Sequence, residues 1–104
     1  MDYKYYSDIF KILSDANRLK IIDILSCGEV CACKILKYLD ITQPTFAHHM
    51  DVLKKNGLVT CRKEGVGCIY KLNLEKFSEI QEVISKLTSD KENCICNKKK
   101  NRRI

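Results

Sequence analysis

The sequence predicts a mainly α-helical domain with a small β-hairpin, the arrangement known as a winged helix-turn-helix. Three observations in its 104 residues predict this fold. Apolar residues recur at helical spacing before the middle of the chain, a tight turn at residues 40–41 separates two short helical patterns, and an alternating pattern follows around residues 64–65. Two short helices joined by a tight turn, and then a hairpin with basic side chains, are the parts of this fold.

Two helices are expected in the first thirty residues. The apolar stripe of the first is formed by Tyr6, Ile9, Phe10 and Leu13. The second begins after Asp15, a good N-cap residue, and ends at Gly28, which we place at the C′ position favoured by glycine. Its spacing leaves open two inward-facing sets, namely Leu19, Ile22 and Leu25 or Ile21, Ile24 and Leu25.

Two further helices are expected before the hairpin. Residues 31–39 predict a short third helix, whose buried residues are Ile35, Leu36 and Leu39. Thr42 is expected to cap a fourth helix, and Pro44 is tolerated in its first turn because the amides there have no partner within the helix. This helix ends at Gly57, and its buried stripe is formed by Phe46, Met50 and Leu53.

Residues 58–63 and 66–73 predict the two strands of the hairpin, around Glu64 and Gly65. In this register Cys61 lies opposite Cys68 on the inner face, where we expect both thiols to act as small hydrophobic groups. A reversible disulfide between them is the less favoured alternative.

A last amphipathic helix is expected over residues 75–89. Its apolar stripe is formed by Phe77, Ile80, Val83, Ile84 and Leu87. The winged helix-turn-helix domain is therefore expected to span residues 1–90, and residues 91–104 form a basic tail that carries Cys94 and Cys96.

The charge distribution favours a polyanionic partner. The net charge is +6, from 19 basic and 13 acidic residues. Residues 31–73 hold seven basic and three acidic side chains, and residues 91–104 hold six and one. A basic middle segment suits double-stranded DNA. For the tail alone we favour a solvated segment without a DNA-binding role, because blocks of like charge usually stay solvated.

Several classes of protein are disfavoured. The sequence has no apolar run of about 18 residues, the length that spans a bilayer, and residues 1–6 contain no apolar export segment. We therefore expect a cytoplasmic protein with no membrane partner, whose seven cysteines are reduced. No Ser/His/Asp, paired-carboxylate or glycine-rich phosphate-binding pattern is present, so we do not expect an enzyme.

The fourth helix carries the residues that we expect to read DNA. A recognition helix enters a major groove about 12 Å wide and contacts base edges with its N-terminal residues. At about 100° per residue, His48 points away from the apolar stripe. The candidates for base contacts are Gln43, Thr45 and His48, with His49 at the edge of the exposed face. The candidates on the hairpin for phosphate or minor-groove contacts are Arg62, Lys63 and Lys71; Lys54 and Lys55 are weaker candidates. A plain solvated loop is the alternative for the hairpin residues.

Three motifs occur in the order and spacing of a known family. Residues 13–22 read L-S-D-A-N-R-L-K-I-I, residues 29–33 read E-V-C-A-C, and residues 41–59 read I-T-Q-P-T-F-A-H-H-M-D-V-L-K-K-N-G-L-V. They resemble the second helix, the cysteine metal box and the recognition helix of the ArsR–SmtB family of metal-sensing repressors. The resemblance implies a homodimer that binds an inverted-repeat operator without a cofactor and releases it when metal binds. Ala16-Asn17 departs from the Pro-Thr of many members, and the basic tail is not typical of the family.

Cys31 and Cys33 are the residues that the resemblance assigns to the metal. Residues two apart within a helix do not face one another, but this pair falls at the start of the third helix. Cys31 takes the cap position, whose side chain turns back towards the following residues, so the two sulfurs can converge. Soft thiolates select soft ions, and we expect As(III) or Sb(III) as inducer, with Cd(II) or Pb(II) as alternatives. Two thiols that merely fill space are the other interpretation.

The third ligand and the exact function stay open at this point. Arsenic-sensing relatives often carry a further cysteine where this chain has Leu36. The third ligand is therefore Cys27, a tail cysteine (Cys94 or Cys96) of either subunit, or a non-protein oxygen. A histidine-rich site of the zinc-sensing type is excluded, because residues 75–89 contain no histidine. A thiol-redox-sensing repressor and a small carrier of soft ions are the alternative functions.

Overall fold

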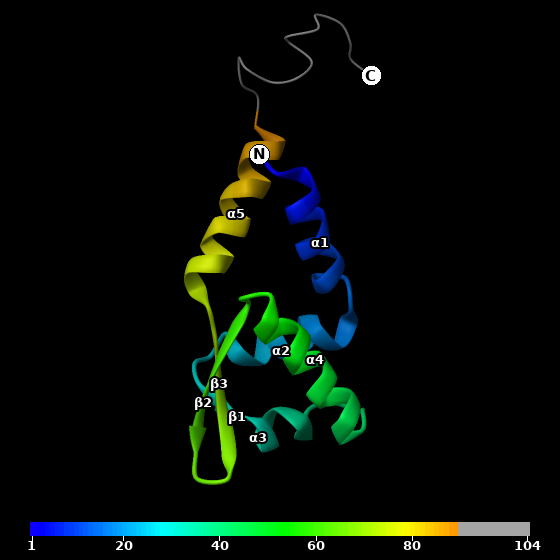
Figure 1. Ribbon diagram of the computed structural model, residues 1–104, viewed down its shortest axis with the longest axis vertical. Coiled ribbons are helices and arrows are strands. Elements are labelled where there is room, and N and C mark those ends of the chain that lie inside the picture. The colour runs from blue at the N-terminus through cyan, green and yellow to red at the C-terminus, as the bar shows by residue number, and fades with distance from the viewer. Residues whose placement is uncertain (90–104) are drawn as a thin grey trace, which may run out of the picture.

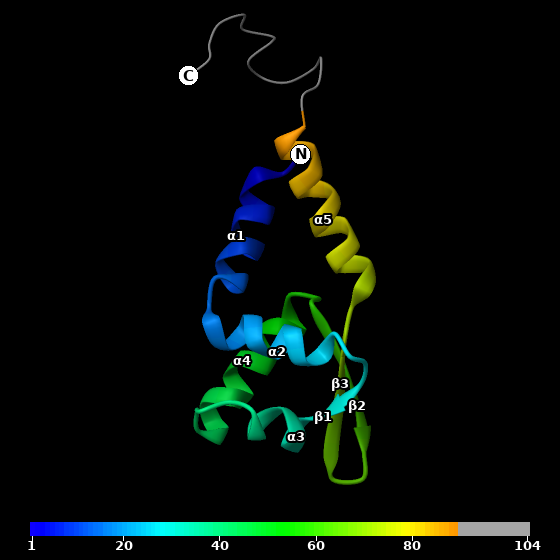
Figure 2. The ribbon, with the colours of Figure 1, turned by 180° about the vertical axis from the view of Figure 1, so that it is seen from behind.

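The computed structural model describes residues 1–89, and this part of the chain forms a winged helix-turn-helix (Figure 1, Figure 2). The elements are α1 (Tyr3–Leu13), α2 (Ala16–Leu25), β1 (Val30–Cys31), α3 (Ala32–Lys37), α4 (Gln43–Lys55), β2 (Val59–Glu64), β3 (Gly67–Leu72) and α5 (Leu74–Thr88). The predicted mainly helical fold is confirmed. The predicted tail, with Cys94 and Cys96, lies outside the described residues.

The core is formed by the inner faces of α2, α3 and α4 and the base of the hairpin, joined by Ile9 of α1 and Ile80 of α5. Its most deeply buried side chains are Ile9, Ile21, Leu25, Ile35, Met50, Leu53, Leu58 and Val59. The exposed fraction of Leu19 is 52%, so the inward-facing set of α2 is the second of the two that the spacing left open. The predicted stripe of α4 is confirmed, because Phe46, Met50 and Leu53 are all buried.

The helix ends follow the predicted capping residues. The side chain of Asp15 accepts a hydrogen bond from the Arg18 amide at the start of α2, and Thr42 accepts one from the Thr45 amide at the start of α4. Gly28 has φ +126°, but it lies two residues beyond the C-cap Ser26, one position further from α2 than predicted. The glycine therefore shapes the loop that leads from α2 into the cysteine segment.

The hairpin has the predicted faces but not the predicted register. Cys61 pairs with Tyr70, so the prediction that it lies opposite Cys68 is wrong. The turn falls at Gly65 and Val66, one residue later than predicted, and Gly65 takes φ +60° at its first position, where glycine is favoured. A turn moved by one residue shifts every pairing by two, which keeps each side chain on its own face.

The sequence does not predict strand β1. Its two residues, Val30 and Cys31, are too few to show an alternating pattern. Val30 pairs with Tyr70 and Cys31 pairs with Ile69, which gives an antiparallel sheet in the order β1-β3-β2. The cysteine segment therefore belongs both to the wing sheet and to the start of α3.

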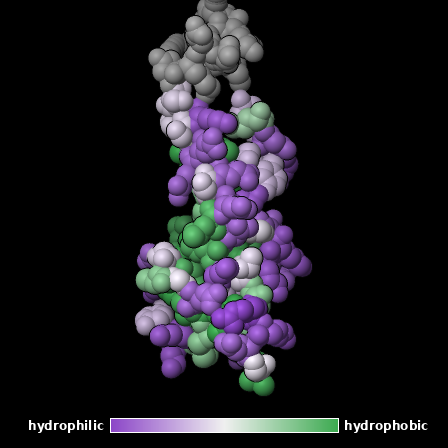
Figure 3. All heavy atoms as spheres, turned by 90° about the vertical axis from the view of Figure 1, so that its left-hand side faces the viewer, coloured by the Kyte–Doolittle hydropathy of each residue, from purple (hydrophilic) through white to green (hydrophobic). Residues whose placement is uncertain are grey.

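Helices α1 and α5 extend together to the end of the molecule opposite the hairpin tip (Figure 1). The Tyr6 hydroxyl donates to the Glu79 carboxylate, which ties the two helices. Exposed apolar side chains remain on them, among them Tyr3, Ile84 and Leu87, with exposed fractions of 57%, 46% and 48%. Seen from the α5 side, apolar surface gathers in the middle of the molecule (Figure 3). None of the helices within residues 1–89 is long and apolar enough to cross a bilayer.

Candidate functional site

The two cysteines of the predicted metal box converge. Cys31 is the N-cap of α3, with φ −75° and ψ 152°, and Cys33 is the second residue of the helix. Because the cap backbone is extended rather than helical, the side chains are not held on divergent helical faces, and the two sulfurs lie 3.2 Å apart. Cys31 is half-buried and Cys33 is exposed. The predicted convergence is confirmed, and the pair is accessible from solvent.

The thiol pair is poised to lose a proton. The Cys33 thiol lowers the pKa of Cys31 by hydrogen bonding to its sulfur, and the nearby Lys34 amide adds to this effect. The pKa of Cys33 is raised in turn, because its proton is shared with Cys31. One thiolate therefore forms readily at Cys31, and the thiolate is the form that binds metals and metalloids.

The described residues supply two sulfurs rather than a complete three-ligand site. No cluster of three His, Cys, Asp or Glu side chains with metal-binding geometry occurs within residues 1–89. Cys27 is exposed and does not join the Cys31–Cys33 pair in such a cluster. The two tail cysteines lie outside the described residues. A pair of adjacent soft sulfurs fits thiophilic ions such as As(III), Sb(III), Cd(II) or Pb(II).

Cys61 and Cys68 lie on the hairpin, and Cys68 lines the same groove as Cys31 and Cys33. Both are half-buried and reduced, and they are diagonal neighbours across the strands. Burial raises the pKa of the Cys61 thiol, and the nearby Cys68 thiol adds to the effect. A thiol that keeps its proton is a poor nucleophile. This agrees with the expectation that Cys61 acts as a small hydrophobic group.

Three of the predicted base-contact residues lie on the exposed side of α4. Gln43, Thr45 and His48 are all exposed. The Thr45 hydroxyl accepts a hydrogen bond from the Thr42 hydroxyl at 3.0 Å, so the start of the helix is held in a defined geometry. The N-terminal end of α4 is therefore free to approach a base edge.

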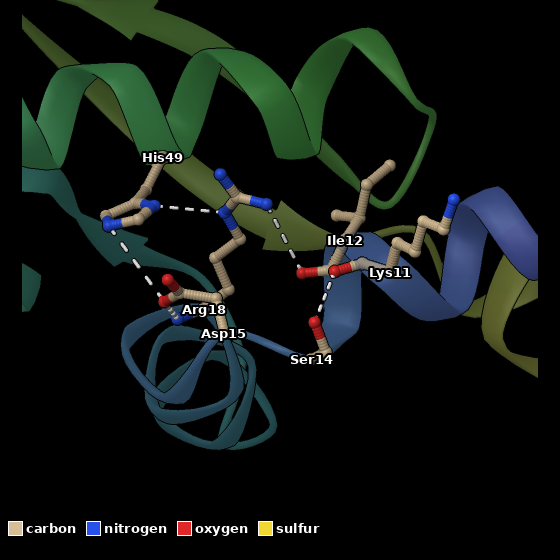
Figure 4. A network of polar contacts seen from close by, with 6 residues as sticks. All are labelled: Lys11, Ile12, Ser14, Asp15, Arg18 and His49. Carbon is tan, nitrogen blue, oxygen red and sulfur yellow. Dashed lines mark hydrogen bonds and ion pairs between the residues drawn. The ribbon is translucent and has the colours of Figure 1, made fainter.

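His49 does not lie on the exposed face, and this part of the prediction is wrong. Its exposed fraction is 7%. Arg18 Nε donates to His49 Nδ1 at 2.9 Å, and His49 Nε2 lies 4.0 Å from the Asp15 carboxylate (Figure 4). Three residues after Phe46 is a rotation of about 300°, which returns to the edge of the buried stripe. Burial lowers the pKa of His49, against the opposing charge of Asp15, so the ring is neutral.

The hairpin residue Arg62 is already paired with two carboxylates. Its guanidinium lies 2.7 Å from the Glu29 carboxylate and 2.9 Å from that of Glu64. Hydrogen bonding to Arg62 lowers the pKa of Glu29. The exposed fraction of the Arg62 side chain is 53%, so a phosphate can still reach it. Lys63 and Lys71 are exposed on the same hairpin.

Two functional features escape the sequence patterns. The first is the link between Arg18 of α2 and His49 of α4, because no short spacing connects residues 31 positions apart. The second is the pairing of Glu29, next to the cysteine box, with Arg62 on the hairpin. It depends on β1, which the patterns do not predict. The sequence signal for this ion pair is the charged residue Glu29, two residues before Cys31.

Comparisons with known proteins find similarity to bacterial regulatory proteins. Residues 15–60 match the family model described as bacterial regulatory protein, arsR family. The chain is 45% identical over 96 residues, 92% of each chain, to the arsenical resistance operon repressor of Staphylococcus aureus. It is 40% identical over 78 residues to the cadmium resistance regulatory protein CadC of Listeria innocua, covering 74% of this chain and 66% of that protein.

The fold comparison agrees. A solved homodimeric winged helix-turn-helix DNA-binding domain from Mycobacterium bovis has a TM-score of 0.66 at 25% identity, covering 81% of this chain and 78% of that chain.

Proposed function

Because this chain belongs to the arsR family of bacterial regulatory proteins, we propose that it is a transcriptional repressor of arsenic resistance that binds operator DNA and releases it when As(III) binds Cys31 and Cys33. The family is one of DNA-binding regulators rather than enzymes. The observation that carries the proposal is the 3.2 Å separation of the two sulfurs at the start of α3. Sensor and reader are contiguous, because α3 leads through one tight turn into α4.

DNA binding is assigned to α4 and the hairpin. Gln43, Thr45 and His48 contact base edges from the exposed N-terminal half of α4, and Arg62 and Lys63 contact phosphates from the hairpin. His49 is left out of this set because it is buried. It positions α4 through Arg18 instead.

The proposed operator-binding form is a homodimer. The apolar side chains Tyr3 of α1 and Ile84 and Leu87 of α5 stay exposed in the single chain. A second copy that covers this end of the molecule would bury them and place two α4 helices on one face of the DNA, as an inverted-repeat operator requires. The domain from Mycobacterium bovis is described as homodimeric, which supports a homodimer here.

Ligation is coupled to α4 through two paths. Ile35 and Leu39, beside the thiol pair, share one core cluster with Phe46 and Met50 of α4. Cys31 also belongs to β1, so a shift of its backbone acts on β3 and the hairpin. Arsenic that draws both sulfurs into its coordination sphere changes the start of α3 and so biases both DNA-binding elements. Coupling of about 1–3 kcal/mol corresponds to a loss of operator affinity of about 5- to 150-fold.

Two variants of this function have support of their own. The similarity to a cadmium resistance regulatory protein, and the soft thiolates, favour Cd(II) or Pb(II) as alternative inducers. The 3.2 Å separation of the Cys31 and Cys33 sulfurs, the exposure of Cys33 and the lowered pKa of Cys31 favour a thiol-redox repressor, because an accessible thiolate is readily oxidised.

An operator titration tests the proposal. An operator duplex is first selected from a random-sequence pool, and its binding to the reduced protein is followed by fluorescence anisotropy. We expect arsenite to release the duplex from the wild type and not from Cys31→Ser. Release by arsenite from Cys31→Ser would overturn the assignment of the site.

The same titration separates the alternatives. Cadmium, lead and zinc salts identify the ion, and peroxide without metal tests the redox variant. A double variant, Cys94→Ser with Cys96→Ser, tests the tail: if one tail sulfur completes the site, arsenite is bound more weakly, and if an oxygen completes it, the response is unchanged.

A further inference from the structure

The thiol pair opens into a groove between the start of α3, the start of α4 and the hairpin tip. The volume of this groove is about 620 Å³, which lies within the range of small-molecule sites. Its walls are mostly apolar and include Leu36, Phe46, Ala47 and Tyr70. The cysteines that line it are Cys31, Cys33 and Cys68. A group attached to an atom held by both sulfurs can therefore lie in the groove.

The coordination chemistry of arsenic decides what such a group is. Trivalent arsenic forms three bonds, and residues 1–89 provide two adjacent sulfurs. Cys68 also lines the groove, but neither it nor any other described residue completes a metal-binding cluster with the pair. When arsenic carries one organic group, carbon takes the third position. Two thiolates then complete the coordination, and no further protein ligand is needed.

We propose that the thiol pair and the groove together bind trivalent arsenicals that carry one apolar organic group, such as an aryl ring. The inference rests on the proposed function, because it assigns a class of inducer to the same two sulfurs. In the reaction, a compound R–As(OH)₂ exchanges two As–O bonds for As–S bonds to Cys31 and Cys33. The two thiol protons leave with the hydroxides as two water molecules. No electrons are transferred, and no co-reactant is needed.

The groove places the organic group against the DNA-reading element. Gln43 and Ala47 of α4 line it, and Val66 at the hairpin tip closes its other side. Burial of an aryl ring between apolar walls adds affinity that an arsenic-bound hydroxide does not gain. The site is therefore expected to prefer aryl arsenicals beyond the preference of a free dithiol.

The test compares phenylarsine oxide with arsenite by calorimetry on the full, pre-reduced chain. The ratio of the two affinities is divided by the same ratio for dithiothreitol, a dithiol with no groove, which removes the intrinsic As–S preference. We expect a normalised preference of at least about tenfold for phenylarsine oxide. Ala47→Leu fills the groove from an exposed helical position. We expect it to lower this preference at least about fivefold, with arsenite affinity changed less than about twofold.

Ala16→Leu is the matched control, since Ala16 is also exposed in the first part of a helix but does not line the groove. We expect it to leave both affinities unchanged. A preference equal to that of dithiothreitol, or one that Ala47→Leu does not lower, overturns the inference while arsenite binding keeps the proposed function standing. If arsenite itself fails to bind the wild type, the proposed function fails, and the inference fails with it.

Discussion

Replacement of Arg18 by methionine tests whether the contact between α2 and α4 holds the recognition helix in place. Arg18 Nε donates to His49 Nδ1 at 2.9 Å, and the exposed fraction of His49 is only 7%. Methionine keeps an unbranched side chain for packing but removes the donor, which leaves a buried nitrogen without its partner. A hydrogen bond from a charged group contributes about 1.5–3 kcal/mol. We therefore expect Arg18→Met to lower the free energy of unfolding by about 1.5–3 kcal/mol.

Thermal unfolding followed by circular dichroism measures this loss. A domain of this size loses about 4–8 °C in Tm for each kcal/mol, so the expected decrease is about 6–24 °C. Protein concentrations must be equal, because the Tm of an oligomer depends on concentration. Lys20→Met is the matched control, because Lys20 is exposed on the same helix, and its effect is expected to stay within about 0.5 kcal/mol. A decrease below about 2 °C for Arg18→Met, or equal decreases for both variants, would refute the reasoning.

Two further predictions follow from the charged network. Burial lowers the pKa of His49 below its ordinary 6.5, so between the folded pKa and 6.5 the unfolded chain binds more protons and stability falls as the pH falls. His49→Gln should therefore show a smaller loss of stability between about pH 7.5 and about pH 5.5 in urea unfolding, and an equal loss would contradict the assignment. Glu29→Gln removes one of the two carboxylates on Arg62, so we expect tighter operator binding with a steeper salt dependence. Anisotropy titrations at several salt concentrations measure both, and weaker binding would mean that Glu29 positions Arg62 for DNA.

Helix positions could be predicted from the sequence because several local signals agree. The caps Asp15 and Thr42, and the stripe of Phe46, Met50 and Leu53, each fix one helix by short-range chemistry. The convergence of Cys31 and Cys33 follows from the same source, since it depends only on where α3 begins.

The predictions are wrong where a single residue, or a partner that is distant in the sequence, determines the local structure. The hairpin register depends on which position of the turn Gly65 takes, and the sequence pattern fits both choices because a shift of two keeps every face. His49 lies at the border of the α4 stripe, and its burial is decided by Arg18 and Asp15 from another helix. Strand β1 forms because β3 offers a pairing partner, and two residues are too few to predict a strand by themselves.

Arsenic K-edge absorption spectroscopy on arsenite-loaded protein counts the sulfur atoms bound to arsenic. We expect at least two sulfur neighbours in the wild type, and the loss of one of them in Cys31→Ser and in Cys33→Ser. A sulfur count that stays the same in both variants would contradict the assignment of Cys31 and Cys33 as the arsenic ligands.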